Sequence, residues 1–360
     1  MKIAVILGTR PEIIKMSPVI RQLENQGETY FILHTGQHYS YSLDKVFFEQ
    51  LKLPHAKYNL EAGSGSHAEQ TAKILIGVES ILRDEKPHIV LVEGDTNSVF
   101  AAALAAVKLH IPVGHVEAGL RSYDRQMPEE INRILTDHCS DYLFAPTPRA
   151  RQILIGEGMP REKVFVTGNT IVDAVYQNLE IAVELGSSLA KLQLHPRKYF
   201  LVTLHRQENV DNPARFAPIL EGLDRIASEF NLPVIYPIHP RARKMMAQFG
   251  LEPRSLTLIE PLDFLTFLHL ENDARLILTD SGGVQEEACI LKIPCVTLRD
   301  NTERPETVDV GANILAGASS QKIVECVNIM LEREYNWTNP FGDGKAGERI
   351  TRIITGAEHG

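Results

Sequence analysis

The sequence predicts an α/β fold of two doubly wound, Rossmann-like domains that face each other across a cleft. Short apolar runs alternate with amphipathic segments along the whole chain, and the series divides into two near residues 170–198. Strands that alternate with helices form parallel sheets covered by helices on both faces. Ligands bind such sheets outside the carboxyl ends of the strands, so we look for the functional residues there.

The expected strands fall into two series. The first comprises Ile3–Leu7, Tyr30–His34, Ile89–Glu93, Val113–Glu117, Tyr142–Ala145 and Val164–Thr167. The second comprises Phe200–Thr203, Val234–Ile238, Leu256–Ile259, Arg275–Thr279 and Cys295–Leu298. We therefore expect a first domain at residues 1–172, a connecting segment at 173–198, a second domain at 199–344 and a last helix at 345–360.

The first strand leads into a tight turn and a helix. Gly8 permits the turn, Thr9 suits the helix cap and Pro11 suits the first helical turn. Arg10 and Lys15 stand near the start of the helix, where they could bind an anion, although a helix that merely begins with an arginine would look the same. The turn has one glycine rather than the three of the dinucleotide-binding fingerprint, so a nicotinamide cofactor is not favoured.

A second unit of this kind lies at residues 275–288. Asp280 and Ser281 can cap the helix that follows the strand, and Gly282 and Gly283 let a ligand approach the backbone. A helix N-terminus offers unpaired N–H groups and a partial positive charge, which suit a phosphate. Glu286 and Glu287 follow in the first turns, where a carboxylate can accept hydrogen bonds from ribose hydroxyls. The alternative is an ordinary capped helix.

Titratable side chains stand at or just after the ends of four expected strands. These residues are Asp95, Glu117, His205 and His239. One such residue is usually a cap or turn former, but four on the ligand-facing edges indicate a site. Glu129 and Arg133 open a further helix, where the acid could instead compensate the helix dipole.

Composition narrows the classes of function. The 360 residues carry a formal net charge of −9, which disfavours nucleic acid as a partner. No apolar run is long enough to cross a membrane, and no signal pattern opens the chain. Four scattered cysteines without a C-x-x-C pair indicate free thiols in a reduced compartment, so we expect a cytoplasmic protein. We expect no metal, since neither H-E-x-x-H nor a zinc-deaminase pattern occurs.

A set of ordered motifs resembles the non-hydrolysing UDP-N-acetylglucosamine 2-epimerases. The motifs are Gly8-Thr9-Arg10-Pro11-Glu12, Gly94-Asp95-Thr96, His115-Val116-Glu117-Ala118-Gly119-Leu120-Arg121, Pro128-Glu129-Glu130-Ile131-Asn132-Arg133, Thr167-Gly168-Asn169-Thr170, Thr279-Asp280-Ser281-Gly282-Gly283 and Thr302-Glu303-Arg304-Pro305-Glu306. They span the chain from the first strand to Asn339-Pro340-Phe341-Gly342-Asp343-Gly344.

The resemblance implies a glycosyltransferase-B-like fold whose last helix crosses back to the first domain, and whose second domain binds UDP. It implies reversible conversion of UDP-N-acetylglucosamine to UDP-N-acetylmannosamine through a 2-acetamidoglucal, without a cofactor, in a homodimer. By motif, it places catalysis on Asp95, Glu117, Glu129 and His205. It places substrate binding on Arg10, Lys15, Asp95, Glu117, Arg133, His205, Leu262, Phe267, Ser281, Gly282, Gly283, Glu287 and Arg304.

Two alternatives stay open. The chain also resembles relatives that act on UDP-diacetamido-glucuronic acid, and a glycosyltransferase would share the fold and the UDP site. Some bacterial members bind a second UDP-N-acetylglucosamine as an activator. The residues that match parts of that site are Gln37, His38, Glu129, Arg206 and His239. The loop Glu61 to Ser66 matches it poorly, so allosteric activation is a weaker expectation.

Overall fold

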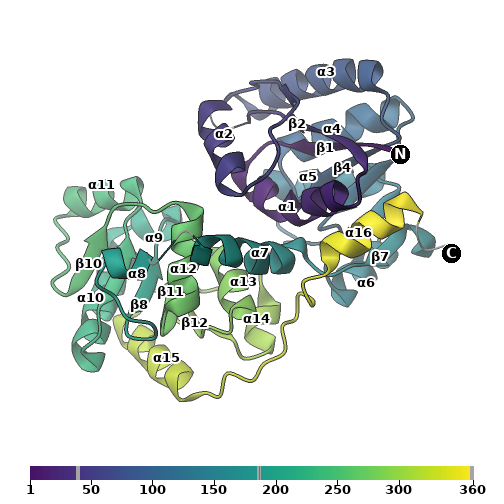
Figure 1. The fold of residues 1–360 in the computed structure, drawn as a ribbon. Coiled ribbons are helices and arrows are strands. Elements are labelled where there is room, and N and C mark those ends of the chain that lie inside the picture. Colours follow the sequence, from purple (N-terminus) through teal and green to yellow (C-terminus); the bar gives the residue numbers. More distant parts are fainter. Residues whose placement is uncertain (38–40, 185, 187, 357–360) are drawn as a thin grey trace. The chain divides into compact units, whose positions relative to one another are not determined.

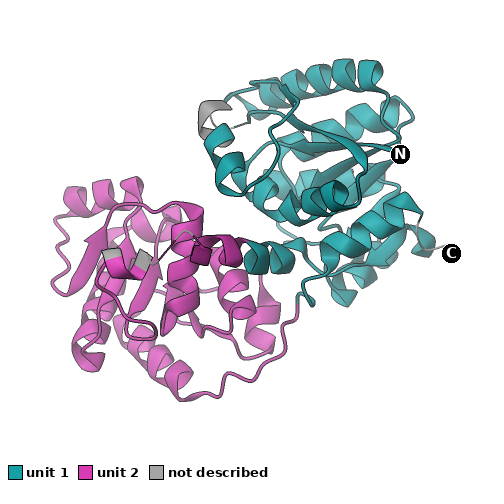
Figure 2. Ribbon diagram, in the orientation of Figure 1, with its two compact units in different colours: residues 1–177, 341–360 teal, residues 178–340 magenta. Residues whose placement is uncertain are grey.

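The chain forms two compact units, coloured separately in Figure 2. A computed structural model describes residues 1–37, 41–184, 186 and 188–356, without the side chains of residues 41–44, 188 and 191. Unit 1 comprises residues 1–177 and 341–360, and unit 2 comprises residues 178–340. His38, one of the residues matched to an activator site, lies outside the described residues.

A parallel sheet of seven strands forms the centre of unit 1, in the order β3-β2-β1-β4-β5-β6-β7. Its strands are β1 (Lys2–Leu7), β2 (Thr29–His34), β3 (Tyr58–Asn59), β4 (Ile89–Glu93), β5 (Val113–Val116), β6 (Tyr142–Ala145) and β7 (Val164–Val166). The central strands are buried because helices cover the sheet, which is why they read as continuous apolar runs.

Most helices of unit 1 connect these strands, and one further helix comes from the C-terminal end of the chain. They are α1 (Arg10–Asn25), α2 (Tyr41–Gln50), α3 (His67–Glu85), α4 (Asn97–Lys108), α5 (Pro128–Cys139), α6 (Pro148–Gly156), the short 3₁₀ helix η1 (Arg161–Lys163) and α16 (Ala346–Thr355), while α7 (Thr170–Glu184) runs from unit 1 into unit 2. In Figure 1 the yellow helix α16 lies beside the purple helix α1. The packing is close, since a Cβ at Gly347 would lie 3.0 Å from the backbone of Pro18.

Unit 2 repeats this architecture with a parallel sheet of six strands, in the order β10-β9-β8-β11-β12-β13. Its strands are β8 (Phe200–Thr203), β9 (Val234–Pro237), β10 (Leu256–Ile259), β11 (Leu276–Thr279), β12 (Cys295–Thr297) and β13 (Asn313–Leu315). Its helices are α8 (Ser188–Lys191), α9 (Gln207–Val210), α10 (Pro213–Phe230), α11 (Pro240–Phe249), α12 (Phe264–Asp273), α13 (Gly282–Ile290), α14 (Pro305–Asp309) and α15 (Ser320–Glu332).

The sequence-based strands all occur, with ends that differ by at most a residue or so. Two edge strands, β3 and β13, were not predicted, because runs of two and three residues carry no periodic signal. One predicted contact was wrong: Thr9 occupies the N-cap position of α1, but its side chain makes no cap hydrogen bond there.

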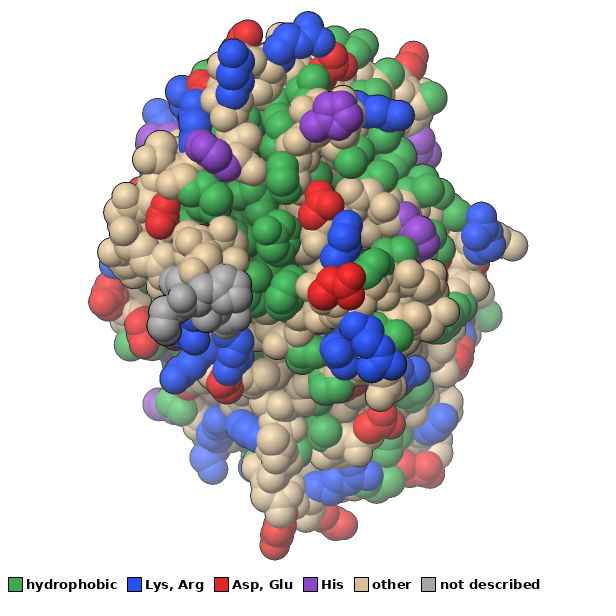
Figure 3. Space-filling view, turned by 90° about the vertical axis from the view of Figure 1, so that its right-hand side faces the viewer, with side chains coloured by type: hydrophobic (Ala, Val, Ile, Leu, Met, Phe, Trp, Pro, Cys, Tyr) green, Lys and Arg blue, Asp and Glu red, His purple; other side chains and the backbone are tan. Residues whose placement is uncertain are grey.

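The surface in Figure 3 shows Lys and Arg side chains interspersed with Asp and Glu, around a band of hydrophobic side chains. Cys139, Cys289, Cys295 and Cys326 are free thiols. Within the described residues, the structure has no helix that is both long and apolar enough to traverse a bilayer.

Candidate functional site

Each sheet has one position where the strand order reverses, between β1 and β4 in unit 1 and between β8 and β11 in unit 2. The loops that follow these strands diverge, and this is where open α/β sheets bind ligands. Four expected site residues follow these four strands: Arg10, Asp95, His205 and Ser281. The topology of each unit therefore supports the positions inferred from sequence.

The turn after β1 is held by the buried carboxyl of Glu12. The backbone N–H of Gly8 donates to Glu12 Oε2 (2.6 Å), and the hydroxyls of Thr9 and Thr96 donate to Oε1 (3.0 and 2.7 Å). Burial raises the pKa of Glu12 to about 7 against the lowering effect of these hydrogen bonds. Gly8 is required by packing, because a Cβ there would lie 2.0 Å from Ser98 Oγ.

Glu117 follows β5 with a backbone φ of +69°, a left-handed conformation that non-glycine residues seldom adopt. Its Oε2 accepts hydrogen bonds from Lys15 Nζ (2.5 Å) and from Asn169 Nδ2 (3.1 Å). Such strain costs on the order of 1–3 kcal/mol and often marks functional sites. Lys15, which we expected to meet an anionic ligand, here contacts side-chain carboxylates.

Asp95 follows β4 and pairs with Arg133 from α5. Arg133 Nη2 lies 2.5 Å from Asp95 Oδ2, and its Nη1 donates to the buried Glu130 (2.6 Å). Asn132 Nδ2 also donates to the backbone oxygen of Asp95 (3.0 Å). The start of α5 therefore positions Asp95, a role for Arg133 beyond the substrate contact that sequence suggested.

A buried histidine supports the same turn. His115 Nδ1 lies 2.7 Å from Asp137 Oδ1, and its Nε2 lies 2.8 Å from the backbone oxygen of Gly94. Arg121 pairs with the other oxygen of Asp137 (2.7 Å). This chain of contacts holds the residue before Asp95. Sequence reasoning named His115 only as part of a motif, and it missed both this role and Asp137.

A pocket of about 290 Å³ adjoins Asp95 in unit 1, and Gln37 and the exposed Glu129 both line it. Gln37 Oε1 also accepts the backbone N–H and the hydroxyl of Ser98 (3.1 and 2.7 Å), so Gln37 holds the start of α4. Of the expected catalytic acids, Glu129 is thus the one most open to solvent.

In unit 2, Asp280 connects the ends of β8 and β11. This fully buried carboxylate accepts the backbone N–H groups of His205 and Arg206 and a side-chain N–H of Asn209, at 3.0–3.2 Å. Its Oδ1 lies 3.2 Å from His205 Nδ1. Burial alone would raise the pKa of Asp280, but these donors lower it. Asp280 therefore orients His205. The sequence had suggested instead that Asp280 caps α13.

Helix α13 begins beside Asp280 with an open N-terminus. Ser281 is its cap and accepts the N–H of Val284 (3.5 Å). A Cβ at Gly282 or Gly283 would meet no described protein atom closer than 3.7 Å. Packing within the protein therefore does not require these glycines, which fits the expectation that a ligand approaches the backbone there.

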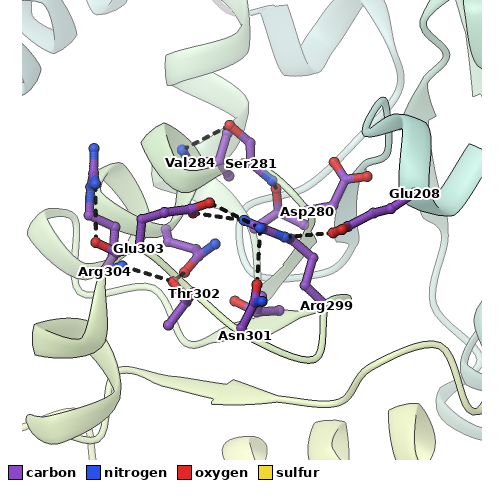
Figure 4. Close-up of polar contacts among 12 residues, drawn as sticks. Glu208, Asp280, Ser281, Val284, Arg299, Asn301, Thr302, Glu303 and Arg304 are labelled. Carbon is purple, nitrogen blue, oxygen red and sulfur yellow. Dashed lines mark hydrogen bonds and ion pairs between the residues drawn. The ribbon is translucent and has the colours of Figure 1, made fainter. Parts of the chain in front are cut away.

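The buried guanidinium of Arg299 organises the loop that carries Arg304 (Figure 4). It donates to Glu208 (2.8 Å), to Asn301 (3.1 Å) and to both oxygens of Glu303 (2.7 and 3.0 Å). It thereby ties the loop after β12 to the residues after His205. Arg299 is a further residue that sequence reasoning missed.

Arg304 pairs with Glu286 of α13, at 2.8 Å between Nε and Oε1. The Glu286 side chain is buried, so this pair lies within unit 2 rather than on its surface. The next residue of α13, Glu287, interacts with Glu271 of α12. Burial, and then the charge and hydrogen bond of Glu287, raise the pKa of Glu271 well above its usual value.

The remaining predicted residues lie around these strand ends in unit 2. Leu262 and Phe267 are half-buried at the start of α12. His239 caps α11, and its ring centroid lies 6.2 Å from that of His205. Burial, then the charges of His205 and Arg241, lower the pKa of His239. Among the described residues, no group of His, Cys, Asp and Glu side chains is arranged to hold a metal ion.

Three comparisons place this geometry among known proteins. A sequence profile of the UDP-N-acetylglucosamine 2-epimerase family matches residues 21–355. The UDP-N-acetylglucosamine 2-epimerase of Methanocaldococcus jannaschii is 57% identical over 362 residues, which covers 99% of each chain. UDP-2,3-diacetamido-2,3-dideoxy-D-glucuronate 2-epimerase of Pseudomonas aeruginosa is 42% identical over 362 residues, 98% of this chain and 99% of that protein.

The fold is similar to a solved structure with bound nucleotides. A crystal structure of the Methanocaldococcus jannaschii UDP-GlcNAc 2-epimerase in complex with UDP-GlcNAc and UDP matches with a TM-score of 0.86 and 57% identity, over 99% of each chain. This similarity confirms the expected class of two doubly wound, glycosyltransferase-B-like α/β domains.

Proposed function

Because this chain belongs to the UDP-N-acetylglucosamine 2-epimerase family, we propose that it interconverts UDP-N-acetylglucosamine and UDP-N-acetylmannosamine. The observation that carries the proposal is the site of Glu117, a strained residue whose carboxylate is oriented by Lys15 and Asn169. A carboxylate held in this way suits proton transfer to and from a sugar carbon.

The chemistry explains why acids and cations are both needed. The C2 proton is not next to a carbonyl group, so its removal is coupled to departure of the diphosphate from C1. The C2–H electrons form the C1=C2 bond of a 2-acetamidoglucal, while the C1–O electrons leave with UDP. Re-addition of UDP with protonation of C2 on the other face gives the epimer. In this scheme Asp95, Glu117 and Glu129 are the acid–base groups.

Unit 2 supplies the groups that suit a departing diphosphate. The N–H groups at the start of α13 and the side chains of His205 and Arg304 are preorganised, so they stabilise the leaving group without rearrangement. By its motif, we also assign Arg10 to nucleotide binding. We assign the ribose to Glu287 and the uracil to Phe267 and Leu262, in keeping with their positions around α12 and α13.

A second candidate substrate is UDP-2,3-diacetamido-2,3-dideoxy-D-glucuronate. The observation that favours it is the 42% identity to the Pseudomonas aeruginosa enzyme, which is lower than the 57% to the Methanocaldococcus jannaschii enzyme. The same elimination would serve both sugars. We further propose a cytoplasmic homodimer whose product supplies polysaccharide synthesis.

Incubation of the purified protein with each sugar nucleotide tests the function. With UDP-N-acetylglucosamine alone, we expect a new anomeric NMR signal from UDP-N-acetylmannosamine and the same equilibrium from either side. Turnover of the diacetamido-glucuronate sugar alone would establish the second candidate. A requirement for an acceptor sugar would instead identify a glycosyltransferase.

We expect Arg304→Ala to weaken UDP binding by about 1.5–3 kcal/mol, the range for a hydrogen bond to a charged group. Isothermal titration calorimetry with UDP measures the change. Arg243→Ala is the matched control, because Arg243 forms an exposed pair with Glu260, and such pairs contribute at most about 1 kcal/mol to stability. Equal UDP affinity in Arg304→Ala and Arg243→Ala would remove Arg304 from the nucleotide site.

A further inference from the structure

The end of β4 carries a buried carboxyl group that the proposed reaction does not use. Glu93 is 2% exposed and is the last residue of a strand that is otherwise apolar. Its Oε1 lies 3.3 Å from Lys15 Nζ and has no hydrogen-bond partner within the described residues. A buried carboxylate costs several kcal/mol unless it is paired and hydrogen-bonded.

Lys15 therefore lies between two carboxyl groups. Its Nζ is 2.5 Å from Glu117 Oε2 and 3.3 Å from Glu93 Oε1. Glu117 also accepts a hydrogen bond from Asn169 and is slightly more exposed than Glu93. One ammonium group can neutralise one carboxylate, and both the shorter distance and the additional donor select Glu117.

The acidic groups around Glu93 also favour its neutral form. Glu12 of α1, Glu117 after β5 and Asp95 in the following turn all face it with the same sign, and Lys15 opposes them. Asp95 is already paired with Arg133. Burial above all, and then these acids, raise the pKa of Glu93 well above its usual value despite Lys15.

We propose that Glu93 is held as a neutral carboxylic acid, that this leaves the charge of Lys15 to Glu117, and that ionisation of Glu93 sets the alkaline limit of epimerisation. Glu93 is thus a positioning residue that acts through Lys15. As the pH rises and Glu93 loses its proton, Lys15 is shared between two carboxylates. The kinetic part of this inference rests on the proposed function.

The pH profile of Glu93→Gln tests the kinetic part. At pH 7 we expect kcat/KM within about threefold of wild type, because the amide resembles the neutral acid. Above the midpoint of the wild-type alkaline limb, the ratio of variant to wild-type kcat/KM should rise by up to about tenfold per pH unit, the limit for one ionisation. Glu12 has a pKa of about 7, so the ratio is compared above about pH 8, where Glu12 is ionised in both proteins.

Two further variants control the experiment. Glu79→Gln makes the same chemical change in an exposed i,i+4 pair on α3 and should keep the wild-type profile. Glu93→Met, also uncharged, repeats the measurement if the Gln variant does not fold. Profiles of wild type and neutral variant that superimpose from pH 6 to 9.5 would overturn the proposal.

Infrared spectroscopy tests the protonation of Glu93 without any substrate. At about pH 8, where Glu12 is ionised in both proteins, the difference between wild type and Glu93→Gln should contain the C=O band of one protonated carboxylic acid, since the band of Glu271 in unit 2 cancels. The midpoint at which this band disappears should coincide with the midpoint of the alkaline limb of kcat/KM, which reports the free enzyme. Absence of the band would overturn the proposal, whereas a band in a protein that turns over no UDP-sugar would refute the proposed function instead.

Discussion

Glu117→Gln should lower kcat by roughly 10²–10⁴-fold, the usual contribution of a positioned acid–base group. The amide keeps the shape of the side chain but cannot accept a proton from C2. It also leaves Lys15 without its nearest carboxylate, at 2.5 Å. Steady-state rates with UDP-N-acetylglucosamine measure the loss, and Asp95→Asn and His205→Ala should fall in the same range.

Folding and nucleotide binding separate this loss from a structural effect. Circular dichroism of Glu117→Gln should match wild type, because Gln at a φ of +69° is no more strained than Glu. UDP affinity should survive best in Asp95→Asn. Glu162→Gln, in an exposed part of unit 1, provides the matched control and should turn over normally. Near-wild-type turnover in Glu117→Gln would exclude this carboxylate from proton transfer.

The second large effect that we expect is complete exchange of the hydrogen at C2 of the sugar for hydrogen from the solvent. If one group removes the proton and another returns a proton from the opposite face, epimerisation in D₂O places deuterium at C2 of UDP-N-acetylmannosamine. The re-formed UDP-N-acetylglucosamine should become labelled as the reaction runs back. NMR and mass spectrometry measure the label, and a trace of free UDP and 2-acetamidoglucal should accumulate on long incubation.

Oxidation and re-reduction by a bound nicotinamide predicts the opposite pattern. The hydrogen would then stay within the complex and no glucal would form. The single glycine of the Gly8-Thr9-Arg10-Pro11 turn favours elimination. Protium alone at C2 after full equilibration in D₂O would contradict elimination and leave the fold unaffected.

The strands of both sheets could be predicted because buried parallel strands are apolar on both faces and bounded by turn residues. Strand order could not be read from the periodicity alone, although the reversals at β1/β4 and β8/β11 follow the usual doubly wound pattern. The edge strands β3 and β13 were missed because they are too short to show a period.

The structure places Asp95, Glu117 and His205 at strand ends, as the sequence predicted. The contacts of the candidate site were less predictable. They could not be predicted where the side chain acts on another protein group. Asp280 suggested a cap, but its partner His205 comes from a different strand, 75 residues away. Arg299 and His115 likewise make contacts that only tertiary folding creates. Glu93 had a signal, a charged residue ending an apolar run, which we used only as a strand boundary.

The return of α16 to unit 1 sets the order in which the chain can complete its fold. The N–H groups of Ala346 and Gly347 donate to Asp173 of the same unit, at 3.1 and 2.9 Å, and α16 packs on α1. Domains usually fold in order as the ribosome releases them, at roughly 5–20 residues per second. Here all of unit 2 emerges before α16, so the first unit made is the last to be finished. At that rate, α1 lacks its packing partner α16 for on the order of 10–40 s during synthesis. Chaperones have access to the apolar face of α1 in this period.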